Sequence, residues 1–291
     1  MNSIDNKTRA KWLMISVSFV WGASYLLMKV ALIELQPLDV LSWRFIIAFV
    51  ILFCIFFKNT SNIDLKILLK STILGSLLFL LYFCLIIGVG KTSASNAGFL
   101  SSSTVIIVPI IDSIIKKYIP SKKTIISIIV VFIGLFLLIV KNNFSFDGGT
   151  IYCLGAAFFY AVYIICSDIL NNSNSKLEIS IWQLGITGLI SILFSISQKG
   201  TISIPHSFDT WLVVIFLAVL CTSYSFIAQS RAQLYLKPEL IGLIFSLEPI
   251  FSAFLSLIFL HEILSFKSYL GAFLILLGIL YSQYNFKKFT K

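Results

Sequence analysis

The chain alternates between long apolar runs and short polar segments from one end to the other. Each run is close to the length of about 20 residues that an α-helix needs to cross a hydrocarbon core about 30 Å thick. Closed β-barrels would show short alternating segments instead. The pattern therefore predicts an all-α integral membrane protein with ten transmembrane helices, at residues 12–33, 38–57, 70–90, 92–115, 124–140, 150–170, 178–198, 210–231, 238–260 and 267–285.

Two stretches half a chain apart share proline and glycine positions. Val108-Pro109-Ile110 leads to a run that contains Gly134, and Glu248-Pro249-Ile250 leads to a run that contains Gly278. Apolar segments can resemble one another through composition alone. The matched proline and glycine positions favour an internal repeat over that explanation.

The repeat divides the ten predicted helices into two sets of five, residues 1–143 and 144–291. An odd number of membrane crossings in each set inverts the second set relative to the first. Inverted repeats are the usual construction of secondary transporters, whose substrate site lies near the middle of the membrane where the repeats meet. We therefore expect two inverted five-helix repeats around a central site.

Composition excludes the soluble and disordered classes. Apolar residues make up 58% of the chain and charged residues only 12%, whereas a typical soluble domain has about 25% charged residues. The five cysteines lie inside apolar runs and form no C-x-x-C pair. We interpret them as free thiols in preference to disulfides or metal ligands.

The net charge of +10 would suggest nucleic acid as the partner of a soluble protein, but here the basic residues lie mainly between the apolar runs. If the N-terminus is cytoplasmic, the segments on that side hold sixteen of the 22 lysines and arginines, and the opposite segments hold four. Cytoplasmic loops of membrane proteins carry this excess. The pattern predicts a protein of the cytoplasmic (inner) membrane with both termini inside and no nucleic-acid partner.

Several short motifs follow one another in a fixed order along nearly the whole chain. They are Trp21-Gly22-Ala23-Ser24 with Lys29, Pro37 and Arg44; Thr92 to Leu100 with Val108-Pro109; and Ser246-Leu247-Glu248-Pro249-Ile250-Phe251 with His261-Glu262, Gly271 and Gly278. In these motifs the chain resembles the EamA-like family of the drug/metabolite transporter superfamily. The resemblance implies two EamA-type repeats and transport of small metabolites, often export of amino acids or related compounds. The first half departs from the family pattern after the fourth span, where Ile119-Pro120-Ser121-Lys122 holds no acidic residue.

Glu248 is the ionisable residue predicted deepest in the membrane, about ten residues into the ninth run. A charge at the centre of a membrane helix costs about 2.5–3.5 kcal/mol on insertion scales, so an ionisable residue at this depth is expected to have a functional or structural role. Burial favours the neutral carboxyl, so a group placed here could take up and release a proton during transport. As a carboxylate it could instead bind a substrate ammonium. A structural carboxylate, hydrogen-bonded to a neighbouring helix, is the alternative, and both interpretations remain open.

Arg44 lies about seven residues below the outer end of the second run and is always charged. It is predicted either to bind an anionic group of the substrate or to pair with Asp39 or Glu34. Lys29, near the outer end of the first run, is interpreted as a structural charge.

Three more charged residues lie near the ends of runs. Asp112 and Lys116 are four residues apart, which favours a local ion pair. For Glu262, at the outer end of the ninth run, the family resemblance implies an outer gate, and a solvated loop acid is the equal alternative.

Polar and aromatic side chains inside the runs are candidates for the lining of a substrate cavity. Helix packing is the alternative for the aromatic ones. With Glu248 and Arg44, the predicted site comprises Trp21, Ser24, Asn96, Tyr160, Trp182, Gln183 and Tyr224, and helix breaks are predicted at Pro109 and Pro249.

Motifs of the common enzyme and cofactor classes do not occur in the sequence. The chain has no G-x-x-x-x-G-K-[ST], no H-E-x-x-H and no G-x-S-x-G, so we expect no ATP, no metal, no cofactor and no enzyme activity.

The sequence predicts a secondary transporter that exports amino acids or their derivatives by alternating access, with protons as an open coupling partner. A carrier of another metabolite or of an organic cation is the alternative, ahead of a membrane enzyme or a scaffold. The expected partners are a small-molecule substrate and the lipid bilayer, and the oligomeric state is left open.

Overall fold

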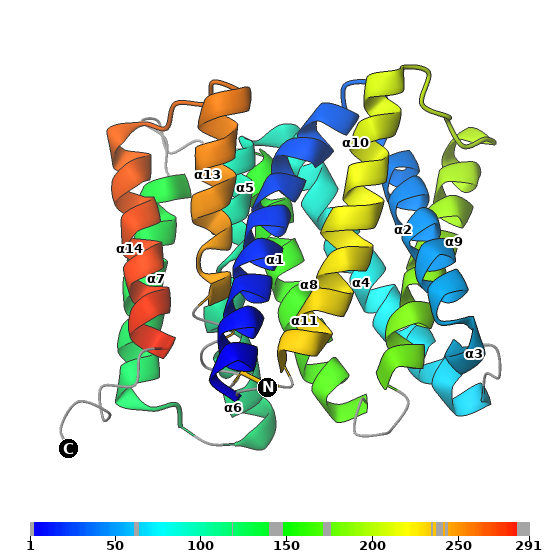
Figure 1. The fold of residues 1–291 in the computed structure, drawn as a ribbon. Coiled ribbons are helices and arrows are strands. Elements are labelled where there is room, and N and C mark those ends of the chain that lie inside the picture. Colours follow the sequence, from blue (N-terminus) through cyan, green and yellow to red (C-terminus); the bar gives the residue numbers. More distant parts are fainter. Residues whose placement is uncertain are drawn as a thin grey trace.

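The computed structural model of the chain is a bundle of helices (Figure 1). It describes residues 3–60, 64–117, 119–139, 148–170, 176–233, 235–236, 241 and 244–283, and these contain no strand. The helices in chain order are α1 (Ser3–Ala31), α2 (Pro37–Ile55), α3 (Phe57–Thr60), α4 (Leu65–Lys91), α5 (Ala94–Ser101), α6 (Thr104–Lys116), α7 (Lys122–Ile139), α8 (Gly148–Leu170), α9 (Lys176–Lys199), α10 (Phe208–Ala218), the π-helix η1 (Val219–Tyr224), α11 (Ser225–Gln233), α13 (Glu248–Phe259) and α14 (Phe266–Gln283).

Seven helical segments of the described chain are long and apolar enough to cross a membrane. They are α1, α2, α4, the α5–α6 pair, α8, α9 and the continuous α10–η1–α11 segment, and α13 and α14 are shorter apolar helices. The chain is therefore a multi-pass membrane protein. The predicted run 238–260 lies in part outside the described residues, and its described part begins with Ile241 and Ile244 and continues as α13.

The outer faces of the bundle carry large apolar side chains. On α7, Phe132 is 68% exposed, and on α14 and α13, Phe273 and Phe254 are 57% and 56% exposed. So many exposed aromatic and aliphatic residues would form unfavourable patches in water. In a bilayer the same faces contact acyl chains, which explains why few charges are needed outside the helix ends.

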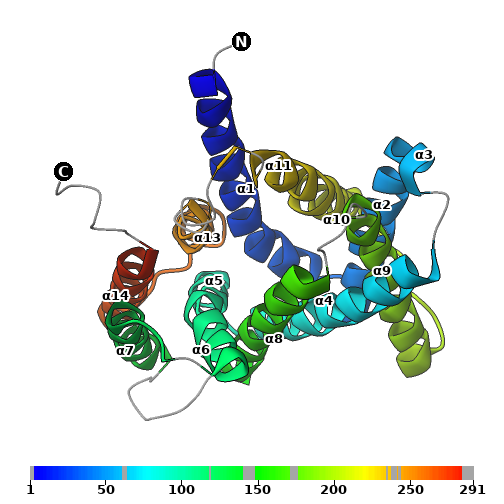
Figure 2. The same cartoon turned by 90° about the horizontal axis from the view of Figure 1, so that it is seen from below.

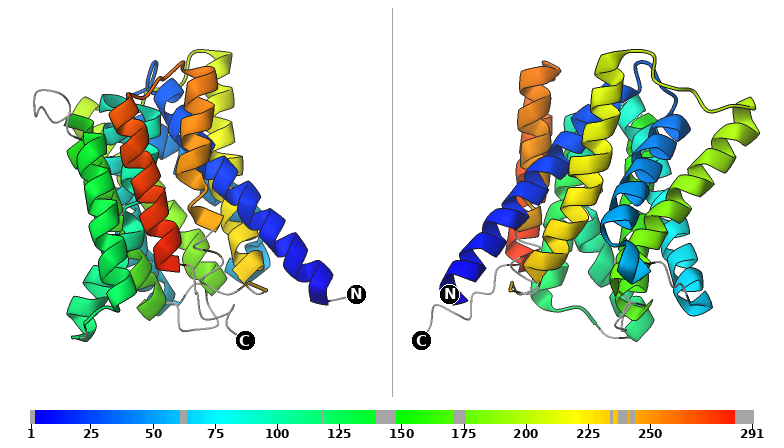
Figure 3. Two further views of the ribbon diagram at one scale, coloured as in Figure 1. Left: turned by 90° about the vertical axis from the view of Figure 1, so that its left-hand side faces the viewer. Right: turned by 45° about the vertical axis from the view of Figure 1, so that its right-hand side comes forward.

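The helices surround a central region when viewed along the bundle (Figure 2). The α7–α14 pair stands at one side, and α2 and α9 pack together at the other. Between them lie α1, α4, α8, α11 and α13, with α1 strongly tilted relative to α13 and α14 (Figure 3). Because α1 begins and α14 ends at the same face of the bundle (Figure 1), this face serves as a reference below and is called the N-terminal face.

The predicted fourth span is interrupted by a turn at Ser102 and Ser103. The hydroxyl of Ser102 donates to the carbonyl of Phe99 at 2.6 Å, and that of Ser103 donates to the carbonyl of Leu100 at 2.6 Å. Side-chain hydroxyls that satisfy backbone carbonyls in this way let a helix break inside a membrane. The interruption therefore lies before Pro109, which is inside α6, and not at the proline itself.

Pro249 is the second residue of α13, directly after the turn formed by Ser246 and Leu247. A proline fits the first turn of a helix because its missing N–H would be unpaired there in any case. Glu248 thus begins a helix instead of lying ten residues inside a continuous one.

Glycines bring α7 and α14 into close backbone contact. A Cβ at Gly134 would lie 2.7 Å from the carbonyl oxygen of Gly271, and a Cβ at Gly271 would lie 2.6 Å from that of Gly134. Small residues at facing positions let membrane helices approach each other closely, and this packing is a main source of their association.

Replacing Gly134 by alanine is expected to destabilise the bundle by about 1–3 kcal/mol, the usual range for overpacking. The methyl group would meet backbone atoms of α14, which cannot turn away as a side chain can. Gly148→Ala is the matched control, since a Cβ there has nothing within 4 Å. Thermal unfolding of the purified variants in detergent measures the difference. Equal unfolding midpoints for the two variants would contradict the tight α7–α14 contact.

Candidate functional site

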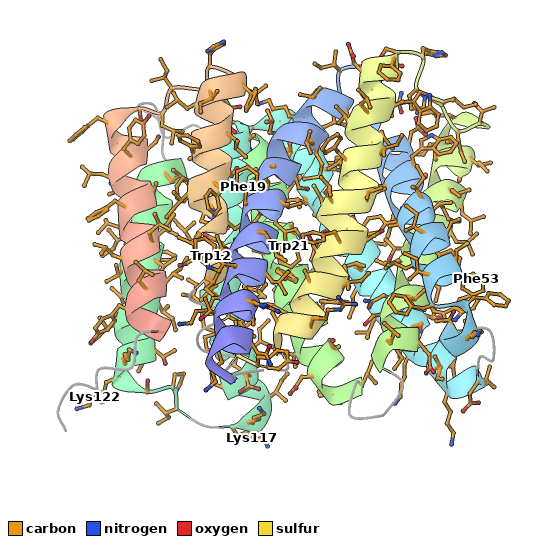
Figure 4. All side chains as sticks on the ribbon, viewed as in Figure 1. Trp12, Phe19, Trp21, Phe53, Lys117 and Lys122 are labelled. Carbon is orange, nitrogen blue, oxygen red and sulfur yellow. The ribbon has the colours of Figure 1, made fainter. Side chains whose placement is uncertain are left out.

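A cavity of about 660 Å³ occupies the centre of the bundle and is lined by residues of α1, α4, α5, α6, α8, α9, α11 and α13. This volume lies within the range of about 300–1,000 Å³ that is typical of small-molecule sites. Trp21, Ser24, Tyr25 and Glu248 line its deep end. Figure 4 shows Trp21 near the middle of α1, so the deep end lies at about half the height of the bundle.

The other end of the cavity reaches the N-terminal face. Asp112 and Lys116 line it from the end of α6, and Asp168 lines it from the end of α8. The ammonium of Lys116 lies 2.7 Å from the carboxylate of Asp112, which confirms the predicted local pair. The lining therefore runs from charged, solvent-accessible residues at one face to Glu248 inside the bundle.

Among the described residues, Glu248 accepts a hydrogen bond from Tyr25. The phenol of Tyr25 donates to its Oε1 atom at 2.8 Å. No lysine or arginine of the described residues forms an ion pair with this carboxylate. Its position in the first turn of α13 places it beside the positive end of the helix dipole, which stabilises a carboxylate.

Arg44 is fully buried in α2, directly behind the cavity wall. Its Nε donates to the hydroxyl of Thr222 at 2.9 Å, and its two NH groups donate to Ser24 Oγ at 3.2 Å and to Tyr82 OH at 3.4 Å. The guanidinium also lies 4.5 Å from the centre of the Tyr82 ring. All these groups are uncharged, so the buried cation has no carboxylate partner among the described residues.

Asp39 and Glu34, the two acids considered as partners of Arg44, are engaged elsewhere. Asp39 accepts from Lys199 at 2.6 Å and from the hydroxyl of Ser195. Glu34, in the loop between α1 and α2, accepts hydrogen bonds from the side chains of Ser207 and Thr210 and from backbone N–H groups at the start of α10. These bonds, led by the one from Thr210, lower the pKa of Glu34 to about 2.

The structure brings four of the predicted site residues to the cavity: Trp21, Ser24, Tyr160 and Glu248. The indole of Trp21 donates to the carbonyl of Cys221 at 3.1 Å, and its ring stacks on Phe245. Arg44 reaches the cavity only through Ser24 and Tyr82. None of the five cysteines forms a disulfide.

The other predicted site residues do not line the cavity. The indole of Trp182 donates to the carbonyl of Thr60 at 3.2 Å, and Tyr224 shares a 2.6 Å hydrogen bond with Ser16. Gln183 lies one layer behind the wall, where it accepts from Tyr163 at 3.2 Å. Asn96 is on α5, and its buried side-chain oxygen has no hydrogen-bond partner among the described residues.

Comparison with known proteins decides the family. The model of the EamA-like transporter family matches residues 8–140 and again residues 147–283. This chain belongs to the EamA-like transporter family. The two matches together cover nearly all of its length.

Curated relatives of this EamA-like chain are named transporters. An uncharacterized transporter of Archaeoglobus fulgidus is 28% identical over 265 residues, covering 91% of this chain and 82% of its own. The uncharacterized transporter YoaV of Bacillus subtilis is 23% identical and covers 94% of this chain and 96% of its own. A solved crystal structure aligns over 94% of this chain and 96% of its own, with a TM-score of 0.67 and 14% identity, which shows a shared fold.

Two hydrogen-bond partners of Arg44 were missed from the sequence. Tyr82 on α4 is a phenol inside an apolar run, and the criterion that selected Tyr160 would also have selected it. Thr222 lies in η1, where the π-helical turn changes which side chains face α2. A sequence pattern gives no signal for such a local change of helical register.

At the end of the bundle opposite the N-terminal face, Glu262 joins three parts of the chain through hydrogen bonds. Its Oε1 atom lies 2.9 Å from the ammonium of Lys29 and accepts from the N–H of Ala94 at 3.0 Å. Its Oε2 atom accepts from the N–H and the hydroxyl of Ser95, both at 3.1 Å. Lys29 also donates to the carbonyl of Thr92 at 2.8 Å. We call these five residues the outer latch; it ties α1, the start of α5 and the α13–α14 loop together.

The pKa of Glu262 is held below its ordinary value. Burial raises it, but the hydrogen bonds from Lys29 and from the N–H groups of Ala94 and Ser95 together outweigh that effect. A carboxyl whose pKa is lowered by folding stabilises the folded state above its unfolded pKa. That contribution disappears as the pH falls through the lowered pKa, so the outer latch is fully formed at neutral pH.

Glu262→Gln is expected to lower the unfolding midpoint of the purified protein at pH 7, because hydrogen bonds to a charged group contribute about 1.5–3 kcal/mol each. The difference from the unmodified chain should shrink once the pH falls below the ordinary pKa of a glutamate, about 4.3, because the unfolded carboxyl is protonated there and the native one only at lower pH. Glu178→Gln, away from the outer latch and the cavity, is the control. A difference that grows on acidification, or none at pH 7, would show that the outer latch does not stabilise the folded chain.

Proposed function

We propose that this chain is a secondary transporter that exports an amino acid or a related amine by alternating access. It would use ten transmembrane helices in two inverted repeats, residues 1–143 and 144–291, in the cytoplasmic membrane with both termini inside. The observation that carries the proposal is the central cavity: it is open at the N-terminal face, ends at Glu248, and is separated from the opposite face by the outer latch.

The packing of the helices supports two equivalent repeats. In the proposed order α1, α2, α4, α5–α6 and α7 correspond to α8, α9, α10–α11, α13 and α14. Under this exchange the α4–α8 contact maps onto the α1–α11 contact, α1–α13 onto α6–α8, and α4–α9 onto α2–α10. The pairs α2–α9, α5–α13 and α7–α14 map onto themselves. Such a mapping is expected if a pseudo-twofold axis relates the two halves.

The directions of the corresponding helices support inversion. α1 ends next to the outer latch, where Lys29 in its last turn binds the carbonyl of Thr92. α8 begins there, because a Cβ at Gly149 in its first turn would lie 2.8 Å from Thr92. The two helices therefore run in opposite directions, as the first helices of two inverted repeats must.

The charge bias supports a cytoplasmic location of the N-terminal face. Lys117 and Lys122 lie at this face (Figure 4), and the positive-inside rule assigns such loops to the cytoplasmic side. The cavity is then open to the cytoplasm in this conformation. A solute loaded from there leaves when the repeats rock, the outer latch opens and the N-terminal end of the cavity closes.

Glu248 is proposed to hold the substrate ammonium, or a proton when the substrate has left. A buried carboxylate that meets no cation of the described protein is stabilised by a cation from outside. The substrate ammonium and the proton would then compete for the carboxylate of Glu248. This competition couples export of the amine to entry of a proton.

An organic cation is the second candidate substrate. Trp21, Tyr25 and Tyr160 line the cavity together with Glu248. Aromatic faces beside a carboxylate favour cations, with about 0.5–2 kcal/mol for each cation–π contact. The two candidates differ in whether the substrate must also carry an anionic group.

Glu248→Gln is expected to reduce transport in proteoliposomes by at least about tenfold, since it removes a charged partner worth about 1.5–3 kcal/mol. The pH dependence of the remaining transport should be lost. The assay measures uptake of each of a panel of radiolabelled amino acids and amines into vesicles, with and without a proton gradient. Glu178→Gln, the same change outside the cavity, should transport normally. If Glu248→Gln transports at an unchanged rate with an unchanged pH profile, Glu248 takes no part in the mechanism. A lower transport rate with an unchanged pH profile would favour uniport.

A further inference from the structure

No described residue neutralises the charge of Arg44. Its side chain is 0% exposed, and its acceptors are the hydroxyls of Thr222, Ser24 and Tyr82 and the sulfur of Met28. An ionised group in a membrane helix normally pairs with an opposite charge or faces a polar cavity. Arg44 faces the cavity indirectly, because two of its four hydrogen-bond acceptors, Ser24 and Tyr82, line the cavity.

In the described part of the chain, Ser24 and Tyr82 accept hydrogen bonds but donate none. A hydroxyl has one proton to donate, and each of these two oxygens receives a hydrogen bond from Arg44. No described residue accepts the proton of either hydroxyl. The neighbouring phenols differ: Tyr25 donates to Glu248, and Tyr163 donates to Gln183.

Hydroxyls that accept from a cation become better donors. Chains of hydrogen bonds polarise one another, and the effect is strongest in a region of low dielectric constant. The Ser24 and Tyr82 protons are therefore presented to the cavity with the charge of Arg44 behind them. A ligand with an anionic oxygen would satisfy both donors and compensate the buried charge.

We propose that Ser24 and Tyr82, backed by Arg44, form a carboxylate subsite in the cavity, and that the substrate is a zwitterion whose ammonium binds Glu248. This inference rests on the proposed function and names its substrate class. Glu248 and Arg44 form no ion pair with each other, although both lie at the cavity wall or directly behind it. An α-amino acid brings the two missing counter-charges in one molecule, whereas an organic cation leaves Arg44 uncompensated.

Thr222 is a positioning residue for this subsite. Its hydroxyl accepts from Arg44 Nε and donates to the carbonyl of Leu217, five residues earlier, at 2.9 Å. This bond belongs to η1, whose wider turn leaves a carbonyl that a helical hydroxyl can reach. The two bonds fix the plane of the guanidinium, so that both of its NH groups point to the hydroxyls of the cavity wall.

The test is equilibrium binding by the purified full-length protein in lipid nanodiscs, with matched ligands that share one side chain. The probes are L-phenylalanine, 2-phenylethylamine and 3-phenylpropanoate, and L-leucine, 3-methylbutylamine and 4-methylpentanoate. At least one amino acid is expected to bind at least about tenfold more tightly than its amine and its acid, because each lacks one charge-assisted contact. This comparison needs no mutation.

Two variants locate the subsite. Ser24→Ala and Tyr82→Phe each remove one hydroxyl, and Tyr82→Phe keeps the ring that lies on Arg44. Each should weaken amino-acid binding about 10- to 100-fold and change binding of the matching amine less than about twofold. Tyr269→Phe, on the exposed face of α14, is the control and should change neither.

Two outcomes overturn the subsite while transport stands. One is equal weakening of amino acid and amine by both variants, and the other is binding of amines with no gain from a carboxylate. Failure of the proposed function has a different signature: no amino acid or amine is taken up by proteoliposomes of the unmodified chain. Binding and uptake therefore separate the two claims.

Discussion

Lipid offers no hydrogen-bond partner, so every charge inside the bundle must find one in the protein or in a bound solute. This constraint explains the arrangement of the ionisable side chains. Lys29 and Glu262 satisfy each other at the closed end, and Lys199 satisfies Asp39. Where the described residues supply only neutral partners, as for Arg44 and Glu248, the side chain lies at the cavity wall or one layer behind it. The incompletely compensated charges therefore mark the candidate site.

The same constraint explains how the backbone can break beside the cavity. The turn at Ser102–Ser103 separates α5 from α6, and the turn at Ser246–Leu247 precedes α13. At the Ser102–Ser103 turn, the serine hydroxyls donate to backbone carbonyls that would accept from backbone N–H groups in a continuous helix. α5 and α13 pack against each other, where the hydroxyl of Ser252 donates to the carbonyl of Ala94 at 3.0 Å. Two interrupted spans thus meet at the outer latch and leave space for the cavity beneath them.

Hydropathy was sufficient to predict the class of the fold. Runs of about 20 apolar residues have few alternatives to membrane helices, and the family assignment rested on motifs that span both halves. Helix breaks were harder to place, because they depend on which hydroxyl binds which carbonyl. A proline shows only that one backbone bond is absent, and the chain tolerates Pro109 inside α6.

The candidate site could be predicted in part. Glu248 and Trp21 were found because charge and depth can be read from the position in a run. Trp182 and Tyr224 pass the same criterion but face other helices. In a helix that is apolar on all sides, the sequence does not tell which face is turned to lipid, to protein or to a cavity. The partners of Arg44 were equally hidden, since they come from helices far apart in the chain.

Access of water to the deep end of the cavity tests the central claim most directly. Tyr160→Cys, in a chain whose five native cysteines are replaced by alanine, is treated with a charged maleimide from either side of oriented membrane vesicles. Lys117→Cys reports the N-terminal face, and Phe132→Cys reports the lipid-facing surface. Residue 160 is expected to react from the side of residue 117, and a transported substrate is expected to slow the reaction. If residue 160 reacts from neither side, like residue 132, the centre of the bundle is dry and the chain does not enclose a transport cavity.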